Sequence, residues 1–519
     1  MKIRTMVVSG LLTVAIAVQS FGTASPGAIV SAANVQQISA NEIESVYDLE
    51  VDSNTLEGWA QGPKIYSEAG IVMDINSGAI LYAKNIDDQH YPASITKVMT
   101  ALVALENYEM DELVTFTWDD IGFLEMGDAH IGIKPDEQLS MEDCMYGMLL
   151  ASANEVSHAI GSHMEGGYEE FIRVMNETAK KIGCKNSNWM NTNGLHDPEH
   201  YTSVRDMALI GSKVFQYEKF REITNTRQYT ISGTNITEET RTFQQNHKMI
   251  WSANDNYYEY CVGGKTGYTD QALTTLVTFA TKKDANNNDV NLVAVVMRTH
   301  GGGQNAYADT RAMLDYAFDN FTRVPITNEM VNNKDIASID ENGYVMLPAG
   351  VTVEKLESTF ARPVEVGDKT GTITYTYQKQ EVGKVNFEIT EALYNKIHGI
   401  EEKTKEEQEP TEQVVEQEEE KSKLPIFAKV LIGVIIVLGI GIFILSRYVA
   451  YKRKQLMRKR RQMRRRQQQR RQYEASRYES NKYYSRDYDL RGRNSKGNNS
   501  RRYDSNVYGS NRYNSRRYE

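Results

Sequence analysis

The stretch from Pro92 to Thr100 reads PASITKVMT and opens an apolar run that ends at Leu105. The run leaves little polar surface, so it predicts a buried helix. Pro92 suits the beginning of that helix, because its missing N–H is not needed there. Residues three apart share one face of a helix, so Ser94 and Lys97 are expected to point the same way. The pair is a candidate nucleophile and base at the positive end of a helix dipole.

Both ends of the 519-residue chain differ in composition from a globular domain. Residues 1–33 carry two early cations, a short apolar run and then small residues, which is the pattern of a secretory signal peptide. Residues 424–446 are almost entirely apolar and long enough to cross a membrane as one helix. The Lys/Arg cluster that follows predicts a cytoplasmic tail, with the residues before 424 outside the cell.

The formal net charge of −10 is unevenly distributed along the chain. Residues 447–519 hold 24 Lys/Arg and 6 Asp/Glu, whereas the rest of the chain is strongly acidic. An acidic exterior argues against nucleic acid as the main extracellular partner. The tail has no periodicity and is predicted to be disordered. Its basic residues favour anionic lipid headgroups, with nucleic acid or a cytoplasmic protein as alternative partners.

Between the two ends, the pattern predicts two folded units. Residues 34–60 are polar, and we expect them to be a poorly ordered lead-in. Residues 61–325 place strand-like runs at both ends and helices between them, which predicts an α/β (α+β) domain with an antiparallel sheet and a helical insertion. Residues 335–397 hold short strands separated by turns and predict a small all-β domain. An acidic, solvated stalk follows at 398–423.

Several elements of the larger domain are predicted individually. Gly70–Asp74 and Ala79–Tyr82 flank Asn-Ser-Gly and are expected to form a hairpin. Met141–Leu150 and Glu155–Met164 are expected to be helices that meet at the corner Ala151–Asn154. Further predicted segments are a helix at Tyr168–Ile182 ended by Gly183, a helix at Ser203–Phe215, strands at Leu273–Ala280 and Asn291–Thr299, and a closing helix at Asn305–Phe321.

The motif Ser-Ala-Asn occurs three times, at Ser39, Ser152 and Ser252. Ser39 precedes the first predicted strand, and Ser252 lies in a polar loop. Ser152 lies at the corner between two apolar helices, where packing would hold its side chain in place. We therefore take Ser152 and Asn154 as the candidate pair.

The motif Lys-Thr-Gly occurs twice, at 265–267 and 369–371. The second copy lies between β segments of the small domain and is typical of a hairpin turn. The first copy follows two glycines, which would let a strand edge approach a ligand closely, and it shares a predicted domain with Ser94. The candidates are therefore Lys265, Thr266 and Gly267, and Lys369 is not one.

With these motifs in the order Ser94, Ser152, Lys265, the chain resembles the low-molecular-mass penicillin-binding proteins, that is, D-alanyl-D-alanine carboxypeptidases. These proteins share their fold and active-site plan with serine β-lactamases. The resemblance covers about residues 60–395 and includes the small β-rich domain. It extends to flanking sequence: YPASITK at 91–97, NGLHD at 193–197 and GKTGYT at 264–269.

The resemblance implies a chemical role for three side chains. Ser94 would attack the terminal D-Ala–D-Ala bond of a peptidoglycan stem peptide and form an acyl-enzyme, and β-lactam antibiotics would acylate it in the same way. Lys97 would accept the serine proton, because burial and the nearby Lys265 both favour the neutral amine. Ser152 would pass a proton to the departing amine.

The resemblance implies a binding role for the others. Asn154 would hold Lys97 and a substrate amide. Lys265 and Thr266 would bind the terminal carboxylate, with Gly267 and Tyr268 completing the substrate-binding set. The backbone N–H groups of Ser94 and Tyr268 would form the oxyanion hole.

Other chemistries receive little support from the sequence. No His/Cys cluster has metal-ligand spacing and no phosphate-binding glycine loop occurs, so no cofactor is predicted. His196 and Asp197 are interpreted as loop structure, because Lys97 makes a histidine base for Ser94 unnecessary. The three cysteines allow one disulfide at most, and free buried thiols are an equal alternative. They are Cys144, Cys184 and Cys261.

Two other functions compete with the carboxypeptidase. A serine β-lactamase must hydrolyse its acyl-enzyme quickly, and residues 155–193 offer no convincing glutamate for that step. A cell-surface protein without activity is the second, although every motif residue is present. The chain also departs from the family twice: it has a predicted spanning helix where members commonly end in an amphipathic helix, and TDQALT at 269–274 where an Ala-Gly pair is typical.

Overall fold

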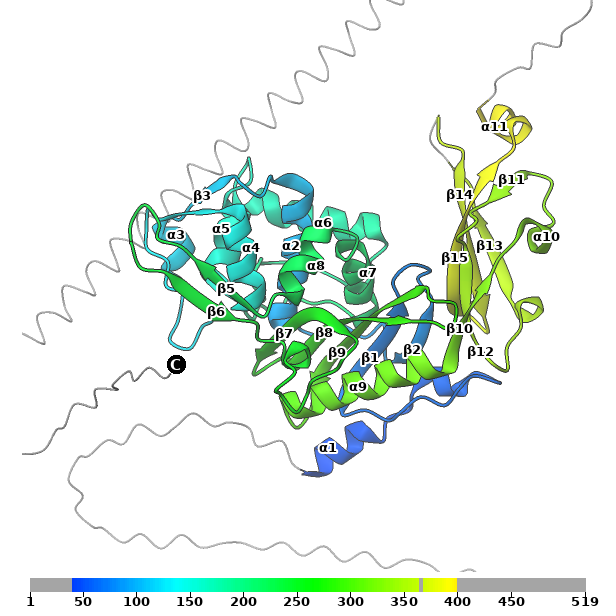
Figure 1. The fold of residues 1–519 in the computed structure, drawn as a ribbon, viewed down its shortest axis with the longest axis horizontal. Helices are drawn as coiled ribbons and strands as arrows, with labels where there is room; N and C mark the ends of the chain where they lie inside the picture. The colour runs from blue at the N-terminus through cyan, green and yellow to red at the C-terminus, as the bar shows by residue number, and fades with distance from the viewer. Residues whose placement is uncertain (1–39, 364–366, 399–519) are drawn as a thin grey trace, which may run out of the picture. The chain divides into compact units, whose positions relative to one another are not determined.

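The structure, a computed structural model, describes residues 40–363 and 367–398 (Figure 1). The predicted signal peptide, spanning helix and basic tail lie outside those residues, as does the stalk beyond its first residue. Among the described residues, no helix has both the length and the apolar character needed to cross a membrane.

A five-stranded antiparallel sheet lies at the centre of the larger domain, in the order β2-β1-β9-β8-β7. Strands from the two ends of the domain meet in it, because β1 pairs with β9 and places Ile71 opposite Val295. The predicted hairpin is confirmed as β1 and β2. The strand bounds are β1 Ser67–Asp74, β2 Ile80–Lys84, β7 Cys261–Thr269, β8 Leu273–Lys283 and β9 Asp289–Thr299.

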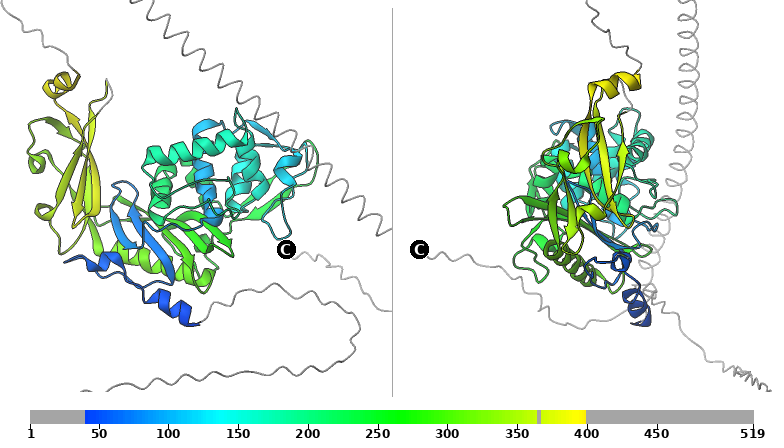
Figure 2. Two further views of the ribbon diagram at one scale, coloured as in Figure 1. Left: turned by 180° about the vertical axis from the view of Figure 1, so that it is seen from behind. Right: turned by 90° about the vertical axis from the view of Figure 1, so that its right-hand side faces the viewer.

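Both faces of this sheet are covered, which explains why β9 is a nearly continuous apolar run. Successive side chains on a strand point to opposite faces. Val293 and Val295 accordingly join the core under the helical insertion, whereas Leu292 and Ala294 join the core that contains α9 (Gly303–Asn320). Figure 2 shows α9 against one face of the sheet and the helices of the insertion gathered on the opposite face.

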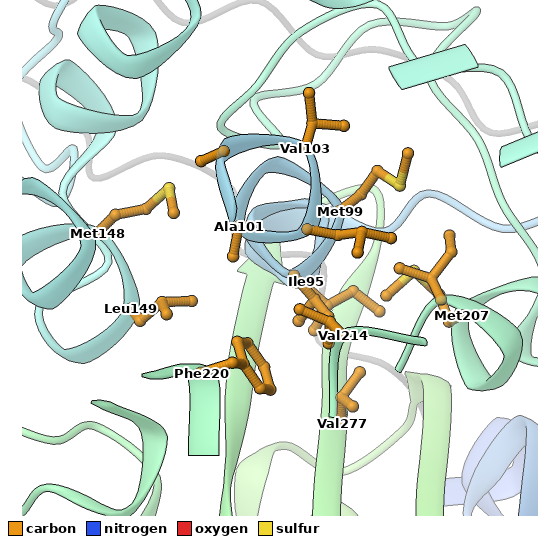
Figure 3. Close-up of a cluster of buried hydrophobic side chains, with 14 of the residues drawn as sticks. Ile95, Met99, Ala101, Val103, Met148, Leu149, Met207, Val214, Phe220 and Val277 are labelled. Atoms are coloured by element: carbon orange, nitrogen blue, oxygen red, sulfur yellow. The ribbon is translucent and has the colours of Figure 1, made fainter. Parts of the chain in front are cut away.

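The helical insertion packs around α2 (Thr96–Asn107), whose residues 96–104 are all buried. Figure 3 shows α2 with Met148 and Leu149 on one side and Met207 on the other, and with Phe220 and Val277 toward the sheet. This helix is the predicted buried one, but Ser94 lies in the short 3-10 turn η2 (Ala93–Ile95) just before it. The surrounding helices are α3 Trp118–Ile121, α4 Met141–Leu150, α5 Asn154–Ser162, α6 Tyr168–Ile182, α7 Val204–Val214 and α8 Glu218–Asn225.

Two small hairpins complete the insertion. One joins β3 (Leu113–Thr115) to β4 (Gln138–Ser140), and the other joins β5 (Gln228–Ile231) to β6 (Arg241–Gln244). The predicted end of α6 is confirmed, since Gly183 has a φ of 102° and closes the helix in the left-handed region.

Residues 40–60 are not the poorly ordered lead-in that their polarity predicts. They form α1 (Ala40–Tyr47) and the 3-10 turn η1 (Asp52–Thr55). Trp59 is buried and packs against Phe321 and Tyr377, with ring centroids 5.1 and 6.1 Å away. A few widely spaced apolar side chains anchor this segment, and the average polarity of its sequence does not reveal them.

The C-terminal strands form two further sheets in the same compact unit. Tyr344 and Lys384 connect them to the central sheet, through a Tyr344 hydroxyl bond to Asp74 Oδ1 (2.8 Å) and a Lys384 N–H bond to the Ser77 carbonyl (2.7 Å). The first sheet pairs β10 Phe321–Pro325 with β12 Tyr344–Pro348, and the second has the order β11 Ile336–Ile339, β15 Gln380–Ile389, β14 Thr370–Tyr377, β13 Glu357–Ala361. Two short helices, α10 Asn328–Val331 and α11 Glu391–His398, accompany them.

The three cysteines are free thiols, which confirms one of the two alternatives left by the sequence. Cys144 and Cys261 are buried, and burial raises the pKa of both thiols. Such thiols are poor nucleophiles, because the thiolate is the reactive form.

Candidate active site

Ser94 is held by a turn that backbone and side-chain contacts fix on both sides. Ala93 has a φ of 50°, a conformation that residues with a Cβ rarely adopt. The Ala93 carbonyl accepts a hydrogen bond from Thr96 Oγ1 at 2.8 Å. Thr96 Oγ1 also lies 2.8 Å from Nε2 of the buried His200. The strained turn is therefore supported by the loop that contains His200.

Lys97 is completely buried and reaches Ser94 as the spacing predicts. Its Nζ lies 3.0 Å from Ser94 Oγ, 2.8 Å from Asn154 Oδ1 and 2.6 Å from the carbonyl oxygen of Asn193. Burial holds the pKa of Lys97 well below its usual range, and the nearby positive charge of Lys265 lowers it further. The site thus favours the neutral amine beside the serine hydroxyl.

Ser152 and Lys265 form a second buried pair. Lys265 Nζ donates to Ser152 Oγ at 3.0 Å and to the Thr266 carbonyl at 2.7 Å. Burial lowers the pKa of Lys265 to about 7. Ser152 has a φ of 64°, so the predicted corner between α4 and α5 is a strained turn that aims its hydroxyl at Lys265.

The edge strand β7 lies directly against the Ser94 turn. A Cβ on Gly267 would stand 2.9 Å from the Ser94 nitrogen and 2.4 Å from Thr275 Oγ1, so only glycine fits. Thr275 in turn donates to the Pro92 carbonyl at 2.9 Å. A cavity of about 440 Å³ opens here, lined by Ser94, Ser152, Thr266, Gly267 and Tyr268 among others. Tyr268 is 61% exposed and lies at the rim.

The structure thus brings together all eight residues selected from the sequence, and it places the rejected motif copies that it describes elsewhere. Ser252 is exposed in a turn, and Ser39 lies outside the described residues. Lys369 pairs with Glu391 at 2.5 Å. Lys369 ends the hairpin connection between the paired strands β13 and β14, as expected, whereas Thr370 already begins β14.

The loop around His196 is held by local contacts of its own side chains. The His196 ring packs edge-on against Tyr91 at 4.7 Å, and Asp197 Oδ1 accepts the Glu199 N–H at 2.8 Å. Neither side chain has a hydrogen bond to Ser94 among the contacts of the described residues. The interpretation of both as loop structure agrees with this geometry.

Sequence reasoning missed two neighbours of the site. The Asn193 carbonyl binds Lys97, and a backbone atom leaves no side-chain signature in a motif search. Glu155 follows Asn154 and is buried, and burial raises the pKa of its carboxyl group. Its Oε1 accepts the Ile131 N–H at 2.7 Å, and Asn154 N donates to the Ala129 carbonyl at 2.8 Å. Because Ala129 also lines the cavity, these contacts position the cavity wall.

The sequence profile of the D-alanyl-D-alanine carboxypeptidases matches residues 57–301, which contain every candidate residue. This domain belongs to the D-alanyl-D-alanine carboxypeptidase family. The predicted resemblance is therefore confirmed. The carboxypeptidase domain includes the central sheet, the helical insertion and both buried lysines.

Curated relatives and a solved structure agree with this assignment. D-alanyl-D-alanine carboxypeptidase DacF of Bacillus subtilis is 26% identical over 333 residues, which are 59% of this chain and 80% of DacF. DacA of Haemophilus influenzae is 26% identical over 355 residues, or 63% and 85% of the two chains. The crystal structure of penicillin-binding protein 5 from Haemophilus influenzae aligns with a TM-score of 0.50 and 25% identity, covering 64% of this chain and 98% of that one. The mixed α/β fold with antiparallel sheets is confirmed.

Replacing Gly194 by alanine is expected to disable the carboxypeptidase domain, although Gly194 is not one of the eight candidate residues. Gly194 has a φ of 85°, and a Cβ there would stand 1.9 Å from the Ala93 carbonyl oxygen. The Ser94 turn would have to move, at a cost of about 3 kcal/mol or more in the free energy of unfolding. Thermal unfolding and penicillin labelling should both show the loss. Gly302→Ala is the matched control, because its φ is also positive but no atom lies within 4 Å of the added carbon.

Proposed function

We propose that this protein is a serine-type D-Ala-D-Ala carboxypeptidase that removes the terminal D-alanine from peptidoglycan stem pentapeptides through an acyl-enzyme on Ser94. It binds penicillin covalently at the same serine. The observation that carries the proposal is the buried Lys97 amine, 3.0 Å from the Ser94 hydroxyl and with its pKa held low. The family match and the named relatives support the same activity.

The hydrogen bonds of Lys97 orient it as the base. A neutral amine has two hydrogens and one lone pair. The two strongest acceptors, Asn154 Oδ1 and the Asn193 carbonyl, take the hydrogens at 2.8 and 2.6 Å. The lone pair is then left for the third neighbour, the Ser94 O–H, whose proton moves to Lys97 as Ser94 Oγ attacks the peptide carbonyl.

The second pair serves the leaving group and the substrate carboxylate. Ser152 Oγ is within 3.0 Å of Lys265 and lines the same cavity as Ser94, so it can pass a proton to the departing D-alanine amine. Protonated Lys265 and the Thr266 hydroxyl bind the terminal carboxylate. The N–H groups of Ser94 and Tyr268 stabilise the oxyanion, a contribution of about 3–4 kcal/mol per donor. Water then attacks the ester with Lys97 again as the base.

Glu155 does not make the site a class A β-lactamase. That mechanism requires an ionised glutamate that activates water. Glu155 is not among the residues that line the Ser94 cavity, its Oε1 is already engaged by the Ile131 N–H, and burial raises its pKa. We therefore expect a long-lived penicilloyl-enzyme rather than rapid turnover of the antibiotic.

Mass spectrometry of a pentapeptide digest tests the activity directly. The full-length protein, incubated with muropeptides that end in D-Ala-D-Ala, should release one D-alanine and yield tetrapeptides without cross-linked dimers. Dimers as the main product would identify a transpeptidase instead. Unchanged pentapeptides, from protein that penicillin still acylates, would contradict the proposal.

We also propose that the chain is exported and anchored by one spanning helix at 424–446, with the tail in the cytoplasm. The signal-like residues 1–33, the apolar segment and the Lys/Arg cluster behind it support this topology. Protease added to intact cells should then digest residues 40–398 and spare an epitope placed after residue 447. A chain that ends at residue 423 should leave the membrane fraction. Retention of that chain in the membrane would contradict the anchor.

Replacing Lys265 by glutamine is expected to lower the second-order rate of penicillin acylation by about 10- to 100-fold, because a charged contact to the carboxylate is lost. With a pKa of about 7, Lys265 is protonated below neutral pH and loses its charge above it, so acylation by wild-type protein should weaken on the alkaline side. Lys265 also lowers the pKa of Lys97. Its removal should therefore move the acid limb of the rate profile to higher pH. Lys369→Gln, in the second Lys-Thr-Gly copy, should leave the whole profile unchanged.

A further inference from the structure

A cavity lies at the opposite end of the central sheet from Ser94. It encloses about 610 Å³ between the β1–β2 turn, the β8–β9 turn, β10, the turn before β12, and β15. Figure 1 shows β10, β12 and β15 near β2, away from the edge strand β7. On β8, Thr275 lines the Ser94 site and Lys283 lines this cavity. At about 3.3 Å per residue, the two positions are about 26 Å apart along the strand.

The lining of this cavity is rich in amides. Asparagines reach the cavity from four separate segments, although packing of a hydrophobic core would not require asparagine at these positions. They are Asn76, Asn287, Asn288, Asn291, Asn342 and Asn386. Asparagine amides, with Ser77 and Tyr344 beside them, present both donors and acceptors without net charge. This chemistry is suited to hydroxyl and amide groups of a neutral ligand.

Three side chains in the cavity offer unused hydrogen-bond donors. Thr281 Oγ1 donates to Asn291 Oδ1 at 2.8 Å, and Thr372 Oγ1 donates to Asn386 Oδ1 at 3.2 Å, which leaves both Nδ2 groups available. Arg323 Nε is buried without an acceptor among the described residues. A buried donor without a partner is costly. These three donors suit a ligand that offers oxygen acceptors.

The charges around the cavity are largely neutralised within the protein. Lys283 pairs with Asp289 at 2.8 Å, and Lys384 pairs with Glu381 at 2.9 Å. The Arg323 guanidinium lies over the Tyr344 ring, 4.4 Å from its centroid, and donates to the Asp289 carbonyl. A polyanion such as a phosphate polymer would need free cations, and two of the three here are already paired.

A second cavity makes the site elongated. It encloses about 410 Å³ and shares Asn76, Asp289 and Asn291 with the first, so the two adjoin. It continues past the turn toward Gln216 and Asn225, which add further side-chain amides. We define the amide groove as these two cavities together. Two adjoining cavities suit several linked units of a polymer better than one small molecule.

We propose that the amide groove binds the glycan of the cell wall, that is, a linear oligomer of N-acetylated amino sugars, and so holds the polymer while Ser94 acts on its peptide branches. The hydroxyl and acetamido oxygens of such a glycan match the donors of Asn291, Asn386 and Arg323. The identification of the ligand as a cell-wall glycan rests on the proposed function. The affinity of the groove for an N-acetylated sugar oligomer does not depend on that function. The groove should therefore increase the rate of D-alanine release from polymeric substrate but not from a free pentapeptide.

Isothermal titration of the full-length protein in detergent with the tetramer of N-acetylglucosamine tests the groove. Asn291→Asp/Asn386→Asp keeps the side-chain shape and the two threonine bonds but replaces both free donors with carboxylates. We expect the double variant to bind the tetramer at least about five-fold more weakly. Asn386→Asp alone should show a smaller loss, and Asn386 is exposed, so folding is not at risk. Asn395→Asp on α11, outside the groove, is the matched control and should bind as wild type.

Activity assays separate this proposal from the proposed function. The double variant should release D-alanine from a soluble pentapeptide at the wild-type rate and from intact glycan strands several-fold more slowly. Equal tetramer binding by wild type and double variant would overturn the groove, as would binding of a glycerol-phosphate oligomer in place of the sugar. Sugar binding by a protein that leaves pentapeptides intact would overturn the proposed function and leave the groove standing.

Discussion

Replacing Ser94 by alanine is expected to abolish covalent labelling by penicillin and to lower D-alanine release by about 10⁵-fold or more, since no acyl-enzyme can form. The side chain is half-buried, and its neighbours Lys97 and Asn154 remain bonded to each other at 2.8 Å. The fold should therefore be retained. Intact-protein mass spectrometry after incubation with penicillin measures the first effect, and a D-alanine assay on a pentapeptide measures the second.

Ser252→Ala is the matched control for this experiment. Ser252 begins another Ser-Ala-Asn copy, but it is exposed and outside the cavity that contains Ser94. Its removal should change neither labelling nor D-alanine release. A Ser94→Ala protein that still acquires the mass of a penicilloyl group would show that the nucleophile is elsewhere.

Replacing Lys97 by methionine is expected to slow acylation by about 10³-fold or more, because the general base is lost. The thioether fills much of the buried volume of the lysine stem but accepts no proton from Ser94. Lys97→Arg should not rescue the rate, since a guanidinium stays charged and cannot act as a base. Stopped-flow acylation across a pH series is the measurement. The wild-type rate should rise as pH passes upward through the lowered pKa of Lys97, and the methionine variant should lose that limb.

Lys84→Met separates loss of a base from loss of a buried amine. Lys84 is also fully buried, and burial lowers its pKa to about 8. Its Nζ donates to the carbonyls of Val46 and Ile65 at 2.9 and 3.0 Å, in contacts that hold α1 near β1 and β2. This variant should unfold at a lower temperature and still be acylated at the wild-type rate. Equal loss of acylation in both lysine variants would argue against a specific role for Lys97.

The sequence could predict the site because each candidate lies in a strongly patterned segment. The apolar run after Ser94 requires a buried helix, and the apolar segments on both sides of Ser152 require a corner. Two preceding glycines distinguish Lys265 from Lys369. The structure supports that choice: a Cβ on Gly264 would stand 2.2 Å from the Val277 carbonyl oxygen, so the glycine allows β7 to pair closely with β8.

Other features could not be derived from patterns, because they depend on long-range packing. The bond from Lys97 to the Asn193 carbonyl joins residues 96 positions apart through a backbone atom. The helix α1 and buried Trp59 lie in a polar segment and are held by β2 and by aromatic rings from the C-terminal strands. Likewise, the amide groove collects exposed turn residues whose individual sequences indicate only turns.

The pairing of β1 with β9 has a consequence for when the protein becomes active. The central strand β9 ends at Thr299, more than 220 residues after its partner β1 has been synthesised. Contacts this distant in sequence form late and slowly. The Ser94 turn rests against β7 and β8, and β8 pairs with β9, so the turn cannot be completed before β9 arrives. A nascent chain therefore has no assembled nucleophile until nearly the whole domain has been synthesised. A chain truncated before β9 should have unpaired strands and no activity, rather than reduced activity.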